Sequence, residues 1–267
     1  QRQMCIRDRT YIYDIFSKKL TEVAPFTVDL LLPSGAENLN YVLYTDESPY
    51  KMQREWLDRL PFDIYSVNVH TGAKRLIGRS YRTAPKWSVN GKWAVMYDPI
   101  AQVWNKFDGA TGKVVNISDA IGYPMFMESY DKPAPAPAYG IAGWTADGNN
   151  VFLYDAYDWW KIDLTGERQP ECLTKGYGRK HGKSIRKMTS NIDKDVFQKD
   201  EKVIVSLWDK DTMDEGVYQL DMKGRLRKYI LYIVFLTIMS IAFGIVRMYR
   251  NLGICGGVSP ISPIPLK

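Results

Sequence analysis

The sequence is poor in the side chains that most often carry metal or nucleophilic chemistry. It has 267 residues, of which 3 are cysteine and 2 are histidine. Cys5 and Cys255 lie near the two ends, which leaves Cys172 alone between them. This excludes a disulfide framework and a paired-thiol metal motif. His70 and His181 are far apart in the chain and have no cysteine partner, so we expect no zinc site, no other metal site and no cofactor.

Acidic residues are missing from the C-terminal part. The net charge of +6 comes from 36 basic and 30 acidic residues, but residues 222–267 hold seven Lys and Arg and no acid. Residues 1–9 hold three Arg and one Asp, so residues 10–221 have 26 basic and 29 acidic side chains, a net charge of −3. The high pI is therefore an effect of the ends, and we expect no nucleic-acid partner.

One long run without charge stands out near the C-terminus. Residues 229–246 are 18 residues without Asp, Glu, Lys or Arg, about the minimum for a transmembrane helix. Two interpretations stay open: a membrane anchor, or a non-native tail such as a shifted reading frame produces. Residues 1–9 fit no strand and resemble a non-native leader, and residues 247–267 read as a disordered tail. The first ten residues also lack the apolar region of a signal peptide.

Aromatic residues are abundant, and they favour an all-β fold. The 8 Trp, 18 Tyr and 9 Phe make up 13% of the chain, and such residues suit pleated, half-buried surfaces. An apolar strand, a small turn and a second strand recur along the chain, and most of these turns contain the glycine that positive φ requires. The predicted hairpins span residues 11–20, 63–77, 103–117, 159–174 and 217–227.

Two further hairpins precede these units and complete a four-stranded pattern. Residues 85–98 place Asn90-Gly91 between two apolar runs, and residues 143–155 place Asp147-Gly148 in the same way. Such dipeptides are strong hairpin signals. Four strands make one propeller blade, so residues 10–228 are predicted to form a partial β-propeller of about four to five blades. Two units look complete and three partial. So few blades cannot close a ring, and one flank should be open.

The connections between these units differ in character. Residues 131–138 are a proline-rich connector, and the spacing of Met52, Trp56 and Leu60 predicts a short helical insertion over residues 50–60. Tryptophans recur throughout the predicted blades, and we expect them to pack between blades, with one or two left free to touch a peptide. These tryptophans are Trp87, Trp93, Trp104, Trp144, Trp159 and Trp160.

Two segments resemble ligand-binding loops, but their residues do not match the spacing of the corresponding motifs. Residues 176–184 suggest a phosphate loop, but Tyr177 stands where glycine is needed and no convincing helix follows. The segment is instead predicted to be a solvated loop between blades. Residues 209–216 suggest a calcium loop, but Met213 occupies a ligand position, so a polar hairpin turn is the better interpretation. The basic cluster around the first segment is Lys175, Arg179, Lys180, Lys183, Arg186 and Lys187.

The clearest signature lies in residues 139–163. Residues 139–148 give a Gly-Trp strand and an Asp-Gly turn, and residues 151–163 follow with Tyr-Asp-Ala-Tyr-Asp-Trp-Trp. This order resembles the propeller domain of prolyl oligopeptidase-family serine peptidases, and residues 85–95 resemble the same family's blade signature. In that family the propeller covers an α/β-hydrolase domain with a Ser-Asp-His triad and admits only peptides and loops. The resemblance implies a hydrolase-domain partner, peptide substrates, and an exported or periplasmic location.

No catalytic residue can be assigned on this resemblance. The nearest approach to a Gly-x-Ser-x-Gly elbow, residues 257–261, lacks the second glycine. Adjacent glutamates, which bind the substrate amino group in the aminopeptidase branch, are absent from the sequence. We therefore expect an accessory propeller domain that gates access to a hydrolase domain absent from this sequence. The alternative is a membrane-anchored propeller that binds a peptide or protein partner without catalysis.

Overall fold

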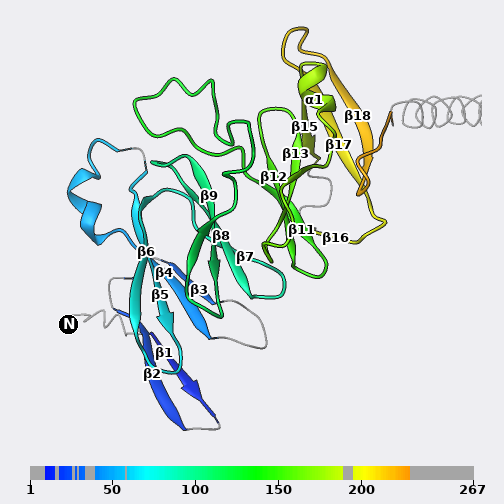
Figure 1. The fold of residues 1–267 in the computed structure, drawn as a ribbon. Helices are drawn as coiled ribbons and strands as arrows, with labels where there is room; N and C mark the ends of the chain where they lie inside the picture. Colours follow the sequence, from blue (N-terminus) through cyan, green and yellow to red (C-terminus); the bar gives the residue numbers. More distant parts are fainter. Residues whose placement is uncertain are drawn as a thin grey trace, which may run out of the picture.

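The chain folds into antiparallel sheets that follow one another in sequence order (Figure 1). The computed structural model describes residues 10–15, 18–25, 28, 30–33, 40–57, 59–188 and 195–228. A two-stranded hairpin of β1 (Thr10–Asp14) and β2 (Lys19–Ala24) comes first, and four larger sheets come after it. The strands of the first two larger sheets are β3 (Leu30–Pro33), β4 (Tyr41–Asp46), β5 (Phe62–Asn68), β6 (Lys74–Tyr81), β7 (Lys86–Trp87), β8 (Trp93–Asp98), β9 (Val103–Asp108) and β10 (Val114–Asn116).

One strand that lies among the strands of the fourth sheet in the sequence pairs with the third sheet instead. Val196–Phe197 (β16) pairs in parallel with β11 (Ile141–Thr145) and so extends the third sheet to five strands, although it lies between two strands of the fourth sheet in the sequence. The remaining elements are β1 (Thr10–Asp14), β2 (Lys19–Ala24), η1 (Ser48–Gln53), β11 (Ile141–Thr145), β12 (Asn150–Tyr154), β13 (Trp159–Asp163), β14 (Glu171–Cys172), α1 (Tyr177–Lys180), β15 (Lys183–Lys187), β17 (Lys202–Asp209), β18 (Glu215–Asp221) and β19 (Leu226–Lys228).

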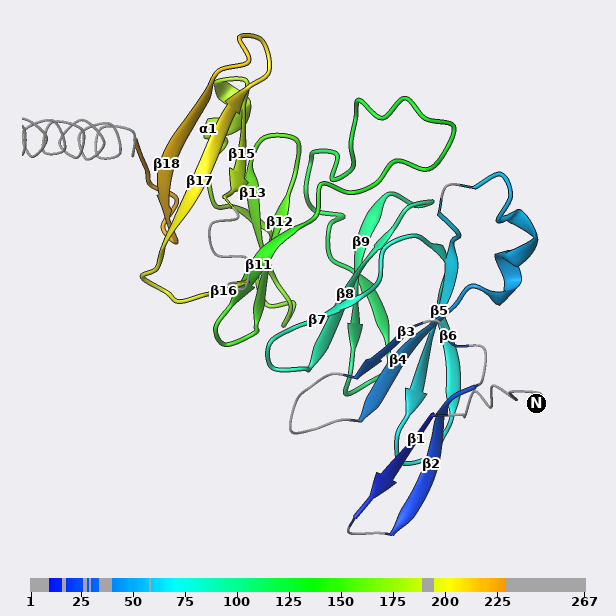
Figure 2. The ribbon, with the colours of Figure 1, turned by 180° about the vertical axis from the view of Figure 1, so that it is seen from behind.

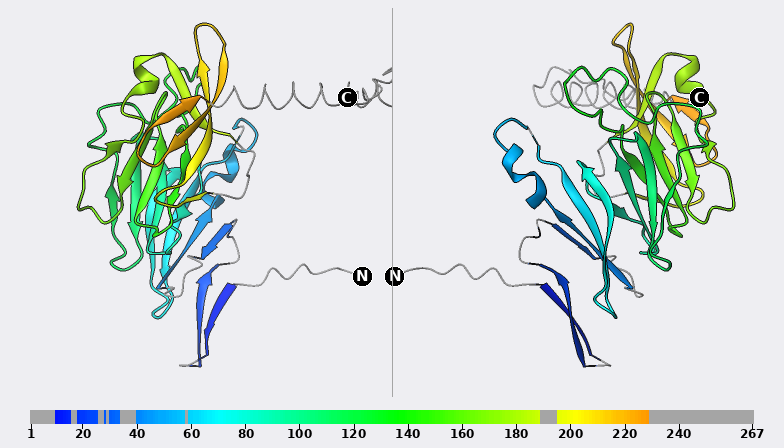
Figure 3. Two further views of the ribbon diagram at one scale, coloured as in Figure 1. Left: turned by 90° about the vertical axis from the view of Figure 1, so that its right-hand side faces the viewer. Right: turned by 60° about the vertical axis from the view of Figure 1, so that its left-hand side comes forward.

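Successive sheets pack face to face through separate apolar clusters. Leu43 and Ile64 of the first sheet pack with Met96 of the second sheet. The second sheet meets the third through a cluster that includes Tyr97 and Trp144. The third meets the fourth through residues that include Trp159, and Figures 2 and 3 show chain order and spatial order running together from blue to orange. The second and third sheets are therefore stabilised by burying one face against the preceding sheet and one against the following sheet.

The predicted all-β fold of four-stranded antiparallel units is confirmed for residues 30–228 where the structure describes them. All seven predicted hairpins form, and turn glycines such as Gly91, Gly112, Gly148 and Gly166 have φ between 64° and 86°. The turns of the second and third sheets also touch, since Asn90 Nδ2 donates to the Asp147 carbonyl at 2.9 Å. All six tryptophans predicted to pack between blades belong to the apolar clusters between sheets.

Two expectations need correction. The predicted short helical insertion over residues 50–60 is a 3-10 helix over Ser48–Gln53, and Met52 and Trp56 are 84% and 72% exposed. Residues 176–184, predicted to be a solvated loop, contain α1, and Gly178 and Ser184 within them are buried. The terminal segments 1–9, 229–246 and 247–267 lie outside the described residues. Within the described part, no helix is long and apolar enough to cross a membrane.

Candidate functional site

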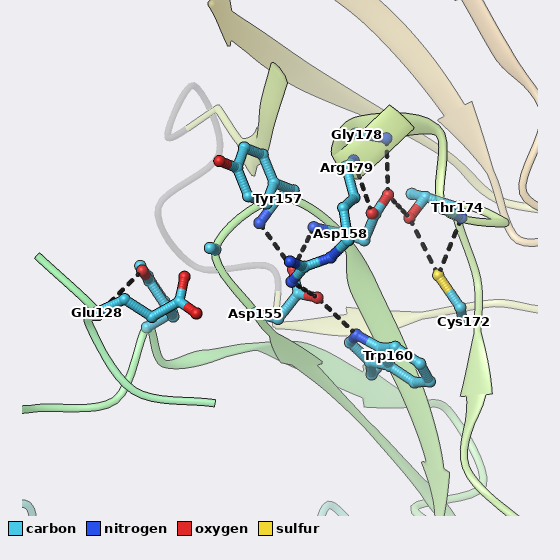
Figure 4. A network of polar contacts seen from close by, with 12 residues as sticks. Glu128, Asp155, Tyr157, Asp158, Trp160, Cys172, Thr174, Gly178 and Arg179 are labelled. Atoms are coloured by element: carbon cyan, nitrogen blue, oxygen red, sulfur yellow. Dashed lines mark hydrogen bonds and ion pairs between the residues drawn. The ribbon is translucent and has the colours of Figure 1, made fainter. Parts of the chain in front are cut away.

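Two buried aspartates occupy the turn between β12 and β13, at the boundary with α1 (Figure 4). They are Asp155 and Asp158 of the Tyr-Asp-Ala-Tyr-Asp-Trp-Trp segment, and they are 0% and 2% exposed. Burying a charged carboxylate is costly unless donors replace the lost water. The donors around these two side chains therefore determine what the segment does.

Asp155 closes its own turn and also reaches the next segment. Its Oδ1 accepts from the backbone N–H groups of Tyr157 at 2.7 Å and Asp158 at 2.5 Å. Asp and Asn commonly hold turns in this way. Its Oδ2 accepts from Trp160 Nε1 at 3.1 Å and from Arg179 Nη2 at 3.0 Å. One carboxylate thus connects the turn, β13 and α1.

Asp158 holds the start of α1 in place. Its Oδ1 accepts from the Thr174 hydroxyl at 2.6 Å and the Gly178 N–H at 2.8 Å, and its Oδ2 accepts from the Arg179 N–H at 3.0 Å. Gly178 has no room for a side chain, because a Cβ there would lie 2.7 Å from the carbonyl oxygens of Lys183 and Tyr157. The segment can approach the aspartate this closely only with glycine at position 178.

Two arginines from the predicted basic cluster balance the buried negative charge. Burial disfavours the Arg179 cation, but the Asp155 carboxylate outweighs that effect and raises the pKa of Arg179. The guanidinium also lies 4.0 Å from the centre of the Tyr123 ring. Arg186 Nη2 donates to the Asp155 carbonyl at 2.7 Å, and burial lowers the pKa of Arg186. These side chains are structural partners, not members of a solvated basic surface.

A hollow of about 350 Å³ lies beside this network, and Cys172 and Arg179 are among its lining residues. Cys172 Sγ accepts from the Gly176 N–H at 3.2 Å, and burial raises the pKa of the thiol. A thiol with a raised pKa is a poor nucleophile at neutral pH. Every oxygen of the two carboxylates is occupied by donors, so neither is free to act as a general base. The network is suited to joining the third sheet to the fourth sheet, and not to chemistry.

The histidines are not brought together. His70 lies in the turn after β5 in the first sheet, and its Nε2 is 3.4 Å from Asn40 Oδ1. His181 follows α1 beside the fourth sheet, with its ring 4.4 Å from that of Tyr177. Within the described ranges, no group of three or more His, Cys, Asp or Glu could hold a metal ion. The predicted polar turn over residues 209–216 is confirmed as the connection between β17 and β18, with Asp209 accepting from two N–H groups of the turn.

Sequence analysis singled out the Tyr-Asp-Ala-Tyr-Asp-Trp-Trp segment but missed what its aspartates do. Their partners Thr174, Gly178 and Arg179 lie 16 to 24 residues away. Thr174 ends the predicted hairpin 159–174, and Gly178 and Arg179 belong to the segment interpreted as a solvated loop. A usable signal was present: Gly176 and Gly178 flank Tyr177, and closely spaced glycines often mark a place where backbone must approach another group.

Comparison with known proteins gives distant structural likenesses. No protein-family model matches the chain, and no curated protein sequence matches it. A putative TolB from Agrobacterium tumefaciens is 13% identical with a TM-score of 0.37, over 72% of this chain and 62% of that one. An acylaminoacyl peptidase from Pyrococcus horikoshii is 9% identical with a TM-score of 0.37, over 84% of this chain and 35% of that one.

A third similar structure is the β-propeller domain of the Trilobed protease from Pyrococcus furiosus, which is described as having an open velcro topology. It is 13% identical with a TM-score of 0.31, over 76% of this chain and 72% of that one. The present chain therefore spans less than two thirds of the TolB protein and about a third of the acylaminoacyl peptidase.

Proposed function

We propose that residues 10–228 are part of a β-propeller that serves as an accessory domain of a prolyl oligopeptidase-like serine peptidase. Its role would be to restrict which peptides reach a hydrolase domain outside these residues, in an exported or periplasmic enzyme. The observation that carries the proposal is the packing of four-stranded antiparallel sheets in chain order. Propeller blades are arranged in this way around a central channel.

The site supports an accessory role over a catalytic one. The segment that resembles the peptidase family, Tyr154–Trp160, is joined to α1 through Asp155 and Asp158 and to β15 of the fourth sheet through Arg186. A serine peptidase needs a nucleophile hydrogen-bonded to a histidine, and a carboxylate that orients this histidine. Neither His70 nor His181 has a hydrogen bond to a serine or a carboxylate within the described part of the chain. A domain of this kind can select substrates but not cleave them.

The first experiment asks whether the chain alone is inert. The purified protein is treated with a fluorophosphonate probe and with proline- and alanine-based chromogenic peptides. The proposal expects no labelled serine and no hydrolysis. Stoichiometric labelling of any serine would overturn it, since the chain would then carry its own nucleophile.

The second experiment asks for the hydrolase domain. The gene is resequenced around codon 228, and the proposal expects a frame that completes a further blade strand and continues to a Gly-x-Ser-x-Gly elbow. A verified frame that ends at codon 267 would overturn the peptidase assignment and favour a propeller that binds a partner without catalysis. If the elbow is present, the full-length product should cleave short peptides and spare folded proteins. Cleavage of folded proteins at a similar rate would contradict gating.

A further inference from the structure

A second hollow, of about 520 Å³, lies at one end of the first and second sheets, away from the Asp155 network. The segment 47–57 forms one side of it with Trp56, and the proline-rich segment 130–137 forms the other with Tyr130. Figures 1 and 2 both show the blue segment and the long green loop at the same end of the two sheets. Tyr97, the penultimate residue of β8, also lines the hollow. The volume falls in the usual range for ligand pockets.

The proline-rich side of this groove is fixed in position. The Tyr97 hydroxyl donates to the Ala136 carbonyl at 3.0 Å, and the Met127 N–H donates to the Pro137 carbonyl at 2.9 Å. Prolines restrict their own backbone and offer no N–H. The wall therefore presents apolar rings and carbonyl groups in a preset conformation. A ligand that docks here does not have to order the loop, which lowers the cost of binding.

The charges in the groove are all positive. Arg59, Arg82 and Lys132 line it, and no aspartate or glutamate does so among the described residues. None of the three cations has an ion pair within the part of the chain that the structure describes, whereas Arg179 and Arg225 are each paired with an aspartate. This contrast is notable because residues 10–221 carry a net charge of −3. Three cations at one groove, none with an ion pair among the described residues, make it a place for an anion.

The aromatic side chains indicate which groups of the ligand would lie next to its anionic group. Trp56 is 72% exposed, so its ring is available on the open side of the groove. Aromatic residues and prolines pack well against proline, aliphatic and aromatic side chains of an extended peptide. A long polyanion such as a nucleic acid is less suited, because the net negative body would repel the charge beyond the groove. The groove thus matches a short segment with one or two carboxylates beside an apolar side chain.

We propose that this groove binds an extended acidic peptide. The peptide's carboxylate would pair with Arg82 and Lys132, and a neighbouring apolar or proline side chain would pack between Trp56 and Tyr130. The proposal does not depend on the peptidase assignment, since a propeller without any hydrolase domain could use the same groove.

The test starts from a display library of random octapeptides, selected on the intact chain and counter-selected on the Lys132→Glu variant. We expect enrichment of sequences with Asp or Glu next to an apolar residue. The enriched peptide is then synthesised with a fluorescein label in three forms: with its acids, with Asn and Gln in their place, and with an amidated C-terminus. The second and third forms separate side-chain carboxylates from a terminal one. Fluorescence anisotropy should show at least tenfold weaker binding for the form that lacks the essential carboxylate.

Matched variants locate the site. Lys132→Gln and Arg82→Gln should each weaken binding severalfold, and Trp56→Ala at least tenfold. Lys113→Gln removes an exposed cation in the β9–β10 turn, at the other end of the second sheet, and should leave binding unchanged. Trp208→Ala removes a partly exposed tryptophan of β17 and should also have no effect. Circular dichroism of each variant distinguishes lost binding from lost folding.

Three results would overturn the proposal. The first is a selection that enriches no peptide with a preference for the intact chain over the Lys132→Glu variant. Equal binding of the acidic and neutral forms is the second, because carboxylate recognition would then be absent. The third is tighter binding of heparin or of a deoxythymidine decamer than of the selected peptide, which would assign the groove to a polyanion.

Discussion

Asp155 Oδ2 and Arg179 Nη2 lie 3.0 Å apart, and this ion pair joins the third sheet to α1 across 24 residues of sequence. The Asp155 side chain is 1% exposed and that of Arg179 is 29% exposed. Because the same carboxylate also accepts from Trp160 Nε1 and two backbone N–H groups, its loss would leave several donors unpaired at once. The pair therefore couples the internal order of the third sheet to the position of α1, which directly precedes β15 of the fourth sheet.

Removing this carboxylate should be costly. Asp155→Ala is expected to lower the free energy of unfolding by about 3–5 kcal/mol, the usual result of breaking a buried ion pair from one side. Urea denaturation measures the change. The matched control is Asp200→Ala, which removes the exposed pair between Asp200 and Lys223 and should cost less than about 1 kcal/mol. Similar losses for both variants would show that Asp155 does not hold the joint.

The space around Gly178 gives a second prediction. Gly178→Ala places a Cβ about as close as 2.7 Å to two backbone oxygens, so α1 must move away from Asp158. We expect a loss of stability of about 1–3 kcal/mol, as is typical of overpacked sites. Gly122→Ala is the control, since a Cβ at position 122 meets no atom within 4 Å. Thermal unfolding by circular dichroism compares the two, and equal melting temperatures would contradict the expected clash.

These two positions show where sequence analysis reached its limit. Hairpins such as 85–98 were predictable because Asn90-Gly91 and the flanking apolar runs lie within a few residues of each other. The first two strands of the first sheet, β3 and β4, were not predicted, because no short turn joins them and Leu30–Pro33 has little alternation of polar and apolar residues. Local patterns specify local pairing well, and they carry little information about partners far along the chain.

The same distinction explains the outcome at the site. The sequence marked Asp155 and Asp158 as part of a signature, but nothing near them in the chain indicated that their donors would come from residues 174–179. The cations Arg179 and Arg186 were interpreted as solvated because charge clusters usually are. Their burial follows from tertiary packing against aspartates that a linear pattern cannot place.

Cys172 should be slow to react while the protein is folded. Burial raises the pKa of its thiol above the ordinary value of 9.0, and the neutral thiol is the unreactive form. In a Cys5→Ser, Cys255→Ser variant, iodoacetamide at pH 7.5 should label Cys172 at least tenfold more slowly in buffer than in urea. Mass spectrometry follows the labelling. Equal rates would show that the thiol is accessible and ionised more readily than its surroundings imply.

Alkaline pH should weaken the fold through its buried tyrosines. Burial raises the pKa of Tyr44, Tyr81, Tyr97 and Tyr154 to about 12. The unfolded chain loses these protons near pH 10, and the folded chain keeps them until about pH 12. The stabilisation is therefore complete below pH 10 and declines between pH 10 and 12.

Urea titrations at pH 9, 10 and 11 measure this loss, and absorbance at 295 nm reports tyrosinate formation. In the Tyr81→Phe variant the free energy of unfolding should fall less steeply with pH, because one fewer buried tyrosine loses its proton on unfolding. An unfolding free energy that does not change from pH 9 to pH 11 would contradict the prediction.

The crossing of β16 onto the third sheet has a consequence for how the protein opens. Val196 and Phe197 lie between β15 and β17 in sequence but hydrogen-bond beside Trp144 of β11. A Cβ on Gly143 would lie 2.5 Å from the Phe197 ring, so the crossing strand fits closely over the glycine. Detaching β17 would pull this strand away and expose the amides of β11 to solvent. The amide hydrogen-exchange rates of β11 in the third sheet should then follow the opening of the fourth sheet. The two sheets would behave as one cooperative unit.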